Sequence, residues 1–143
     1  EILQFIGDAI LIVFEIKRPE DEAMVCDAAL DAAIDAFASI AVVNHRRRHA
    51  GMPQIEFGLG LHLGTVTHAN VGAPNRLAFN VVGPAVNKTA RLQSMTKQAG
   101  VPLLLSKEFA DHIRRPIRPI GHFDLRGISG PQEMFTPEDE PQV

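Results

Sequence analysis

A carboxamide and a guanidinium stand four residues apart in the second half of the chain, at Asn87 and Arg91. The stretch from Pro84 to Gln98 predicts a helix that ends at Gly100, and residues four apart share one face of a helix. Side chains of these two types can together orient a sugar and stabilise negative charge on a phosphorus. Taken alone, such a pair is more typical of polar residues on a helix surface.

Two further charged residues stand at a predicted turn and at the end of a predicted strand. Asp8 follows Gly7 between the apolar runs 2–6 and 9–16, which predict a β-hairpin. An aspartate there more often forms the turn than binds a metal ion. Arg126 lies in the segment 124–127, where it is either a phosphate-binding cation or a solvated cation at the end of a strand.

The elements that must position these residues follow from hydrophobic periodicity and from Gly and Pro. The predicted elements after the hairpin are a helix over 19–50, strands over 54–68 and 77–82 joined by a turn at 72–76, the helix over 84–98, a strand over 101–105, a helix over 106–113, strands over 122–125 and 133–135, and a frayed tail. We expect an α+β domain with a ferredoxin-like βαββαβ core, in which helices cover one face of a mainly antiparallel sheet. The expected boundaries are a domain over 1–136 and a tail over 137–143.

The strand over 54–68 alternates apolar and other residues, which indicates one buried face and places His62 on the polar side. The basic run 45–49 is interpreted as the solvated end of the long helix, and the alternatives are a phosphate or partner patch and a two-histidine metal site. Cys26 lies in no motif that would make it catalytic.

Composition narrows the class of protein. The chain has 143 residues, 45% of them hydrophobic, and a formal net charge of −3. A dominant disordered state is excluded by the apolar fraction, and no apolar run reaches the roughly 18 residues that span a bilayer. The charge balance argues against a nucleic-acid partner. With a single cysteine no intrachain disulfide can form, which agrees with a cytoplasmic location.

The order and spacing of several short segments are more specific than any one of them. These segments are Gly-Asp at 7–8, Gly-Leu-Gly-Leu-His-Leu-Gly at 58–64, Asn-Val-Gly at 70–72, Arg76, Phe-Asn-Val-Val-Gly at 79–83, Val-Asn at 86–87, Ala-Arg-Leu at 90–92 and Asp-Leu-Arg-Gly at 124–127. In this order they resemble the catalytic domain of the class III nucleotidyl cyclases, the adenylate and guanylate cyclases. The resemblance covers nearly the whole chain.

The resemblance implies an activity and a role for each residue. Such enzymes convert ATP or GTP to the 3′,5′-cyclic monophosphate and pyrophosphate, by attack of the ribose 3′-hydroxyl on the α-phosphate with two Mg²⁺ or Mn²⁺ ions per site. By this resemblance Asn87 positions the ribose and Arg91 contacts the α-phosphate. Arg126 stands where the family usually has a lysine near the triphosphate, and Asp8 matches the second of two metal-binding aspartates.

The first of those aspartates precedes Glu1 in the family, so we expect the chain to be incomplete at its N-terminus. Sites at the interface of a homodimer, and fused sensor or membrane domains outside this chain, are also implied. The alternative is an inactive cyclase-like module that binds nucleotide or serves in regulatory dimerisation.

Gln4 and Asn80 occupy the two positions that select the purine in the family. Both are amides, which can turn to satisfy either base. We expect ATP as the main substrate, with measurable use of GTP, because the glutamate that accepts from guanine is missing.

Overall fold

The computed structural model describes residues 2–71 and 78–141. Its helices and strands are β1 (Ile2–Ile6), β2 (Ala9–Val13), a 3-10 turn η1 (Pro19–Asp21), α1 (Glu22–His49), β3 (Leu59–Leu61), β4 (Thr67–Val71), β5 (Ala78–Val82), α2 (Pro84–Ala99), β6 (Leu103–Ser106), α3 (Lys107–Ala110), β7 (Ile117–Asp124) and β8 (Pro131–Pro137). No helix in the described part of the chain has the length and apolarity that a membrane crossing requires.

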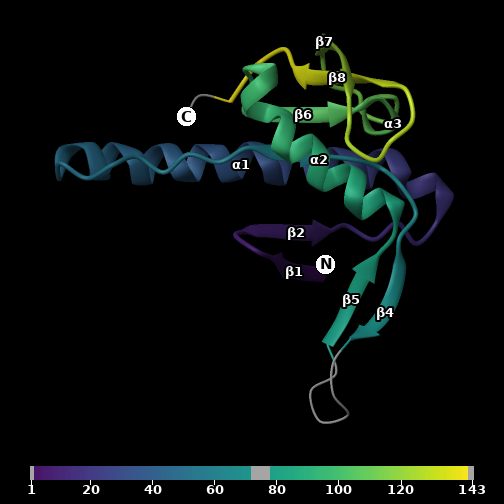
Figure 1. Ribbon diagram of the computed structural model, residues 1–143. Helices are drawn as coiled ribbons and strands as arrows, with labels where there is room; N and C mark the ends of the chain where they lie inside the picture. The colour runs from purple at the N-terminus through teal and green to yellow at the C-terminus, as the bar shows by residue number, and fades with distance from the viewer. Residues whose placement is uncertain (1, 72–77, 142–143) are drawn as a thin grey trace.

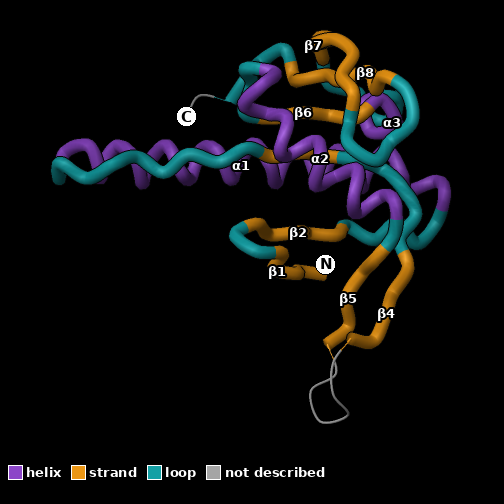
Figure 2. The backbone as a smooth tube through the Cα atoms, in the orientation of Figure 1, coloured by secondary structure: helices purple, strands orange, loops and turns teal. Residues whose placement is uncertain are grey.

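The α+β class is confirmed, with a ferredoxin-like arrangement of strands and helices (Figure 1). The central sheet has the order β3-β6-β8-β7, and two hairpins, β1-β2 and β4-β5, form small sheets of their own. Four of the described strand pairs are antiparallel and one, β3 with β6, is parallel. The β4-β5 hairpin extends away from the central sheet (Figure 2). The turn expected at 72–76 lies outside the described residues.

The central sheet is covered on both faces, so the expectation of helices on one face is wrong. Leu103 and Leu105 of β6 pack with α1, around Leu30 and Phe37. Leu104, which alternation along the strand turns to the opposite face, packs with Leu92 of α2. Because all residues of β6 are buried, this strand has no polar face, and the fold needs a helix on each side of it.

The predicted strand over 54–68 is also partly wrong, because only 59–61 and 67–71 are strands. The side chain of Asn44 in α1 binds the backbone of Ile55: its Nδ2 donates to the Ile55 carbonyl at 2.8 Å, and its Oδ1 accepts from the Ile55 N–H at 2.7 Å. The ring of Phe57 stacks on Phe37 with a centroid distance of 4.6 Å. The segment before β3 therefore pairs with a helix side chain instead of a strand.

Most other expectations hold, with shifted ends. The β1-β2 hairpin forms, with Gly7 at a φ of 60° in its turn. The helix expected over 106–113 is shorter, since α3 ends at Ala110. The segment after β8 is held, because the N–H of Glu138 donates to the Pro116 carbonyl and Glu140 pairs with Arg118. The prediction of a frayed tail is therefore wrong for residues 138–140.

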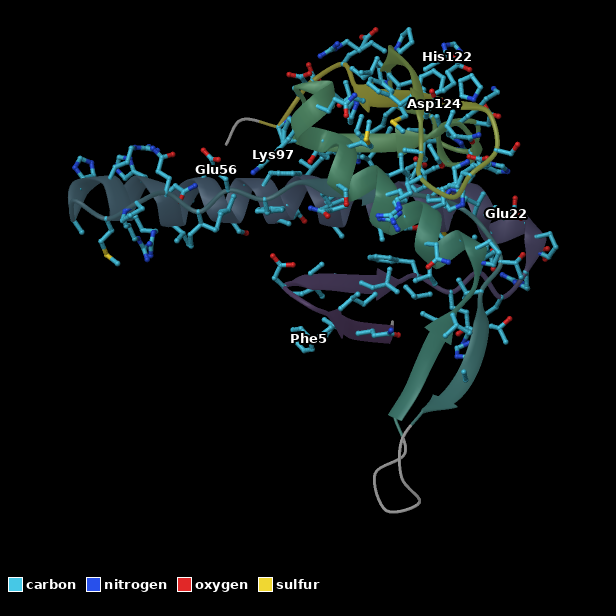
Figure 3. All side chains as sticks on the ribbon, in the orientation of Figure 1. Phe5, Glu22, Glu56, Lys97, His122 and Asp124 are labelled. Carbon is cyan, nitrogen blue, oxygen red and sulfur yellow. The ribbon has the colours of Figure 1, made fainter. Side chains whose placement is uncertain are left out.

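The β1-β2 hairpin presents apolar side chains to solvent. Leu3 pairs with Ile12 and Phe5 pairs with Ile10 across the two strands, and all four are exposed. Phe5, at 73% exposure, lies on the side of β1 away from α1 (Figure 3).

Candidate active site

Asn87 and Arg91 both lie exposed on α2, one turn apart. The helix begins directly after Gly83, whose φ of 135° favours glycine, and Pro84 occupies its first turn. The N–H of Asn87 donates to the Gly83 carbonyl at 3.3 Å. The bend at Gly83 therefore fixes where α2 begins and so where the Asn87 amide and the Arg91 guanidinium lie. The two side chains share one face of the helix, as the spacing predicted.

Three glycines let α2 approach the sheet closely. A Cβ on Gly60 of β3 would stand 2.8 Å from Leu92 Cβ and 2.9 Å from the Gln93 nitrogen. A Cβ on Gly58 would clash with the side chain of Thr96, and a Cβ on Gly64 would clash with Ala85. The side of this segment expected to be polar and solvated is instead the surface on which the helix with Asn87 and Arg91 rests.

Gln4 lies next to the strand that carries Asn80. Its Oε1 accepts a hydrogen bond from the N–H of Val81 at 3.0 Å, which links β1 to β5. Asn80 precedes Val81 in β5 and is paired with Ala69, while its side chain lies outside the described residues. The structure thus brings the two predicted base-selecting positions together at the backbone level.

Asp8 lies exposed in the turn between β1 and β2. That turn is at the end of the hairpin that points away from the start of α2 (Figure 1). Its carboxylate is the donor type that Mg²⁺ and Mn²⁺ prefer. In residues 2–71 and 78–141, however, no group of three or more His, Cys, Asp or Glu side chains is arranged to hold a metal ion.

Arg126 lies exposed in the turn between β7 and β8. The N–H of Ile128 donates to the Leu125 carbonyl at 3.0 Å and closes this turn, and Gly127 has a φ of 81°. The guanidinium therefore stands on a short, defined turn next to Leu125, which is buried in the core.

A cavity of about 600 Å³ lies between β2 and β3 and is lined by Ile12, Leu61 and Val86 among others. Of the predicted site residues whose side chains the structure describes, Gln4, Asp8, Asn87, Arg91 and Arg126, none lines it. These five side chains therefore lie outside this cavity.

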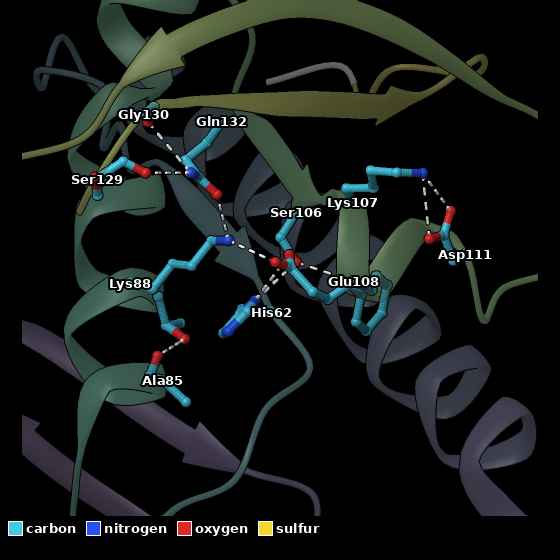
Figure 4. Close-up of polar contacts among 12 residues, drawn as sticks. His62, Ala85, Lys88, Ser106, Lys107, Glu108, Asp111, Ser129, Gly130 and Gln132 are labelled. Atoms are coloured by element: carbon cyan, nitrogen blue, oxygen red, sulfur yellow. Dashed lines mark hydrogen bonds and ion pairs between the residues drawn. The ribbon is translucent and has the colours of Figure 1, made fainter.

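A polar cluster that the sequence did not reveal lies beside α2. It consists of His62, Lys88, Ser106, Glu108 and Gln132, which converge from the residue after β3 and from α2, β6, α3 and β8 (Figure 4). His62 is only 7% exposed and its Nδ1 lies 2.8 Å from the Ser106 Oγ, so it is not the solvated residue that alternation indicated. Its place in the same alternating series as Gly58, Gly60 and Gly64 was the one available signal.

Other candidates stay outside the site. Cys26 is buried, which raises the pKa of its thiol to about 11, and the carboxylates of Glu22 and Asp27 add to the increase. A thiol with so high a pKa is inert at neutral pH, as expected. His45 and His49 contact each other edge to face, exposed at the end of α1.

Comparison with known proteins identifies the relatives of this fold. The family described as "Adenylate and Guanylate cyclase catalytic domain" matches residues 1–135. A protein named adenylate cyclase, from Anabaena cylindrica, is 32% identical over 117 residues, which are 79% of this chain and 22% of that protein. The chain therefore spans about a fifth of the length of this curated relative.

Two solved structures share the fold. The adenylyl cyclase CyaB from P. aeruginosa superposes with a TM-score of 0.82 at 23% identity, over 96% of this chain and 71% of that one. The guanylyl cyclase Cya2 superposes with a TM-score of 0.76 at 21% identity, over 99% of this chain and 75% of that one.

Proposed function

Because the chain belongs to the adenylate and guanylate cyclase catalytic-domain family, we propose that it converts ATP, and GTP to a smaller extent, to the 3′,5′-cyclic monophosphate and pyrophosphate. In this proposal residues 1–136 form the catalytic domain. The alternative of an inactive, nucleotide-binding or regulatory module is an outcome of the test below.

The observation that carries the proposal is the exposed pair Asn87 and Arg91 on a helix whose position is fixed by backbone contact with the sheet. Asn87 can donate to and accept from the ribose, so it orients the attacking 3′-hydroxyl. Arg91 presents a fixed fork of donors to the α-phosphate, where negative charge increases as the new P–O bond forms. A preorganised helix face supplies both groups without reorganisation during the reaction.

Contacts with the base and with the triphosphate are assigned to Gln4, Asn80 and Arg126. Gln4 and Asn80 lie on neighbouring strands and read the purine edge. Since the Gln4 Oε1 is occupied by the Val81 N–H, its Nε2 faces the base as a donor, and the acceptor at N1 of adenine suits it. Arg126 binds the triphosphate from its turn.

Asp8 is proposed as a ligand of the divalent ions, which fits an exposed carboxylate at a tight turn. When bound, Mg²⁺ or Mn²⁺ would lower the pKa of the ribose hydroxyl and neutralise phosphate charge.

The site is proposed to form between two copies of the chain. Asp8 lies at the far end of its hairpin from the start of α2, so Asp8 of one copy would complete the site that holds Asn87 and Arg91 of the other. A two-fold dimer of this kind carries two equivalent sites.

The test is incubation of the intact protein with Mg²⁺ or Mn²⁺ and either ATP or GTP, followed by identification of the product by mass spectrometry. We expect cyclic AMP and pyrophosphate, and a loss of about 100-fold or more in kcat for Arg91→Ala. Lys97→Ala, which removes an exposed cation from the last turn of the same helix, should leave the rate unchanged. Nucleotide binding without any cyclic product would favour the inactive module.

A further inference from the structure

Lys88 directly follows Asn87 on α2. Asn87 is exposed to solvent, whereas the side chain of Lys88 points into the protein. Its side chain is only 12% exposed. The Nζ donates to Glu108 Oε1 at 2.7 Å and to Gln132 Oε1 at 2.8 Å (Figure 4). One ammonium group therefore ties the second turn of α2 to the start of α3 and to β8.

The partners of Lys88 are themselves held. The Nε2 of Gln132 donates to the carbonyl of Gly130 at 3.2 Å, which sets the direction of the Gln132 Oε1. Partial burial acts to raise the pKa of the Glu108 carboxyl, but the hydrogen bond from Lys88, a backbone hydrogen bond and the charges of Lys88 and His62 together outweigh it, so this pKa lies below its usual range. Glu108 is thus a stable anion opposite the lysine at neutral pH.

The two sets of contacts around α2 have different effects. Gly60 and its neighbours fix how close the helix lies to β3, through contact with Thr89, Leu92 and Gln93. Leu92 packs against Leu104 of β6 and holds the side of the helix that faces the sheet. The bond from Lys88 to Glu108 acts from the flank of the helix and adds resistance to rotation of the helix about its own axis. Residue 88 is about 100° around the helix from Asn87, so the flank and the exposed face turn together.

We propose that Lys88, held by Glu108 and Gln132, is a positioning residue that sets the rotation of α2 and with it the direction of Asn87 and Arg91. The proposal rests on the proposed cyclase function. It assigns Lys88 no contact with the nucleotide, because its ammonium is already engaged and nearly buried. A misplacement of about 1 Å at such a site can cost about 100-fold in rate.

The test compares the intact protein with Lys88→Met, with Glu108→Gln and with the charge-reversed double variant Lys88→Glu, Glu108→Lys. The matched control is Lys107→Met, which breaks the exposed ion pair of Lys107 with Asp111 in α3 and leaves α2 untouched. We expect Lys88→Met to lower kcat by about 10- to 100-fold, with KM changed less than about threefold and the folded fraction unchanged.

Amide hydrogen exchange over 86–91 is the readout that does not need activity. We expect exchange there to rise by about tenfold or more in Lys88→Met and to fall back in the charge-reversed variant. Unchanged exchange would overturn the proposal, and so would a rise in KM at constant kcat, which would make Lys88 a substrate ligand. If the wild-type protein made no cyclic nucleotide, the proposed function would fail, while exchange would still decide whether Lys88 holds the helix.

Discussion

The side-chain oxygen of Gln4 accepts a hydrogen bond from the backbone N–H of Val81 at 3.0 Å, although 77 positions separate the two residues. Val81 is buried, so its N–H needs this acceptor. The Gln4 amide is therefore held in one orientation. This corrects the expectation that it can turn to suit either purine.

A held amide predicts how substitutions at Gln4 change the choice of base. Gln4→Glu keeps an acceptor for Val81 but replaces the donor that faces the base with a second acceptor, which matches the N1–H of guanine. We expect the ratio of kcat/KM for GTP over ATP to rise by about tenfold, or about 1.4 kcal/mol. Steady-state kinetics with both nucleotides measure this ratio.

Gln4→Lys is the matched comparison. It keeps a donor toward the base, so the preference for ATP should stay or increase. It leaves the Val81 N–H unpaired, at a cost of about 1–3 kcal/mol in the free energy of unfolding. An unchanged ratio in Gln4→Glu would show that Gln4 does not contact the base.

The sequence predicted α2 and the common face of Asn87 and Arg91 well, because Pro84, Gly100 and the spacing of these two residues are local signals. It failed before β3, because the bond of Asn44 to Ile55 joins residues 11 apart and removes Ile55 from any strand. Alternation alone cannot report such a partner.

The roles of Gly60 and Lys88 were missed for a related reason. A glycine on the non-apolar side of a strand looks the same whether water or a helix backbone covers it. A lysine on a helix is usually solvated, and only the arrangement of α2, α3 and β8 places Glu108 and Gln132 around Lys88.

Gly60→Ala should displace α2. The added methyl group would lie 2.8 Å from Leu92 Cβ and 2.9 Å from the backbone nitrogen of Gln93, which cannot move independently of the helix. We expect a loss of about 1–3 kcal/mol in the free energy of unfolding, measured by urea denaturation, together with lower cyclase activity. Ala90→Ser adds one atom to the exposed side of the same helix and is the control. Equal stability of Gly60→Ala and wild type would refute the close contact.

His62 should make the fold sensitive to mild acid. Burial lowers the pKa of His62 below its ordinary value of 6.5; the carboxylate of Glu108 acts in the opposite direction and the ammonium of Lys88 in the same one. The unfolded chain therefore takes up a proton at this residue before the folded chain does. The contribution of neutral His62 to the free energy of unfolding is therefore present above pH 6.5. It is lost as the pH falls from the pKa of His62 in the unfolded chain toward its lower pKa in the folded chain.

Thermal unfolding between pH 7.5 and pH 5 measures this dependence. The Tm of His62→Gln should fall less steeply than that of the wild type over this range. Substitution of the exposed His122 by Gln should leave the wild-type slope unchanged. Parallel curves for wild type and His62→Gln would mean that His62 is not held neutral by burial.

Complementation between two inactive variants of the intact protein tests the central claim, a cyclase site shared by two copies of the chain. Asp8→Ala and Asn87→Ala should each be inactive alone. When they are mixed and allowed to exchange subunits, half of the dimers carry one intact hybrid site, so cyclic AMP formation should return to about a quarter of the wild-type rate. Failure to regain activity, with heterodimers shown to form by native mass spectrometry, would contradict the account.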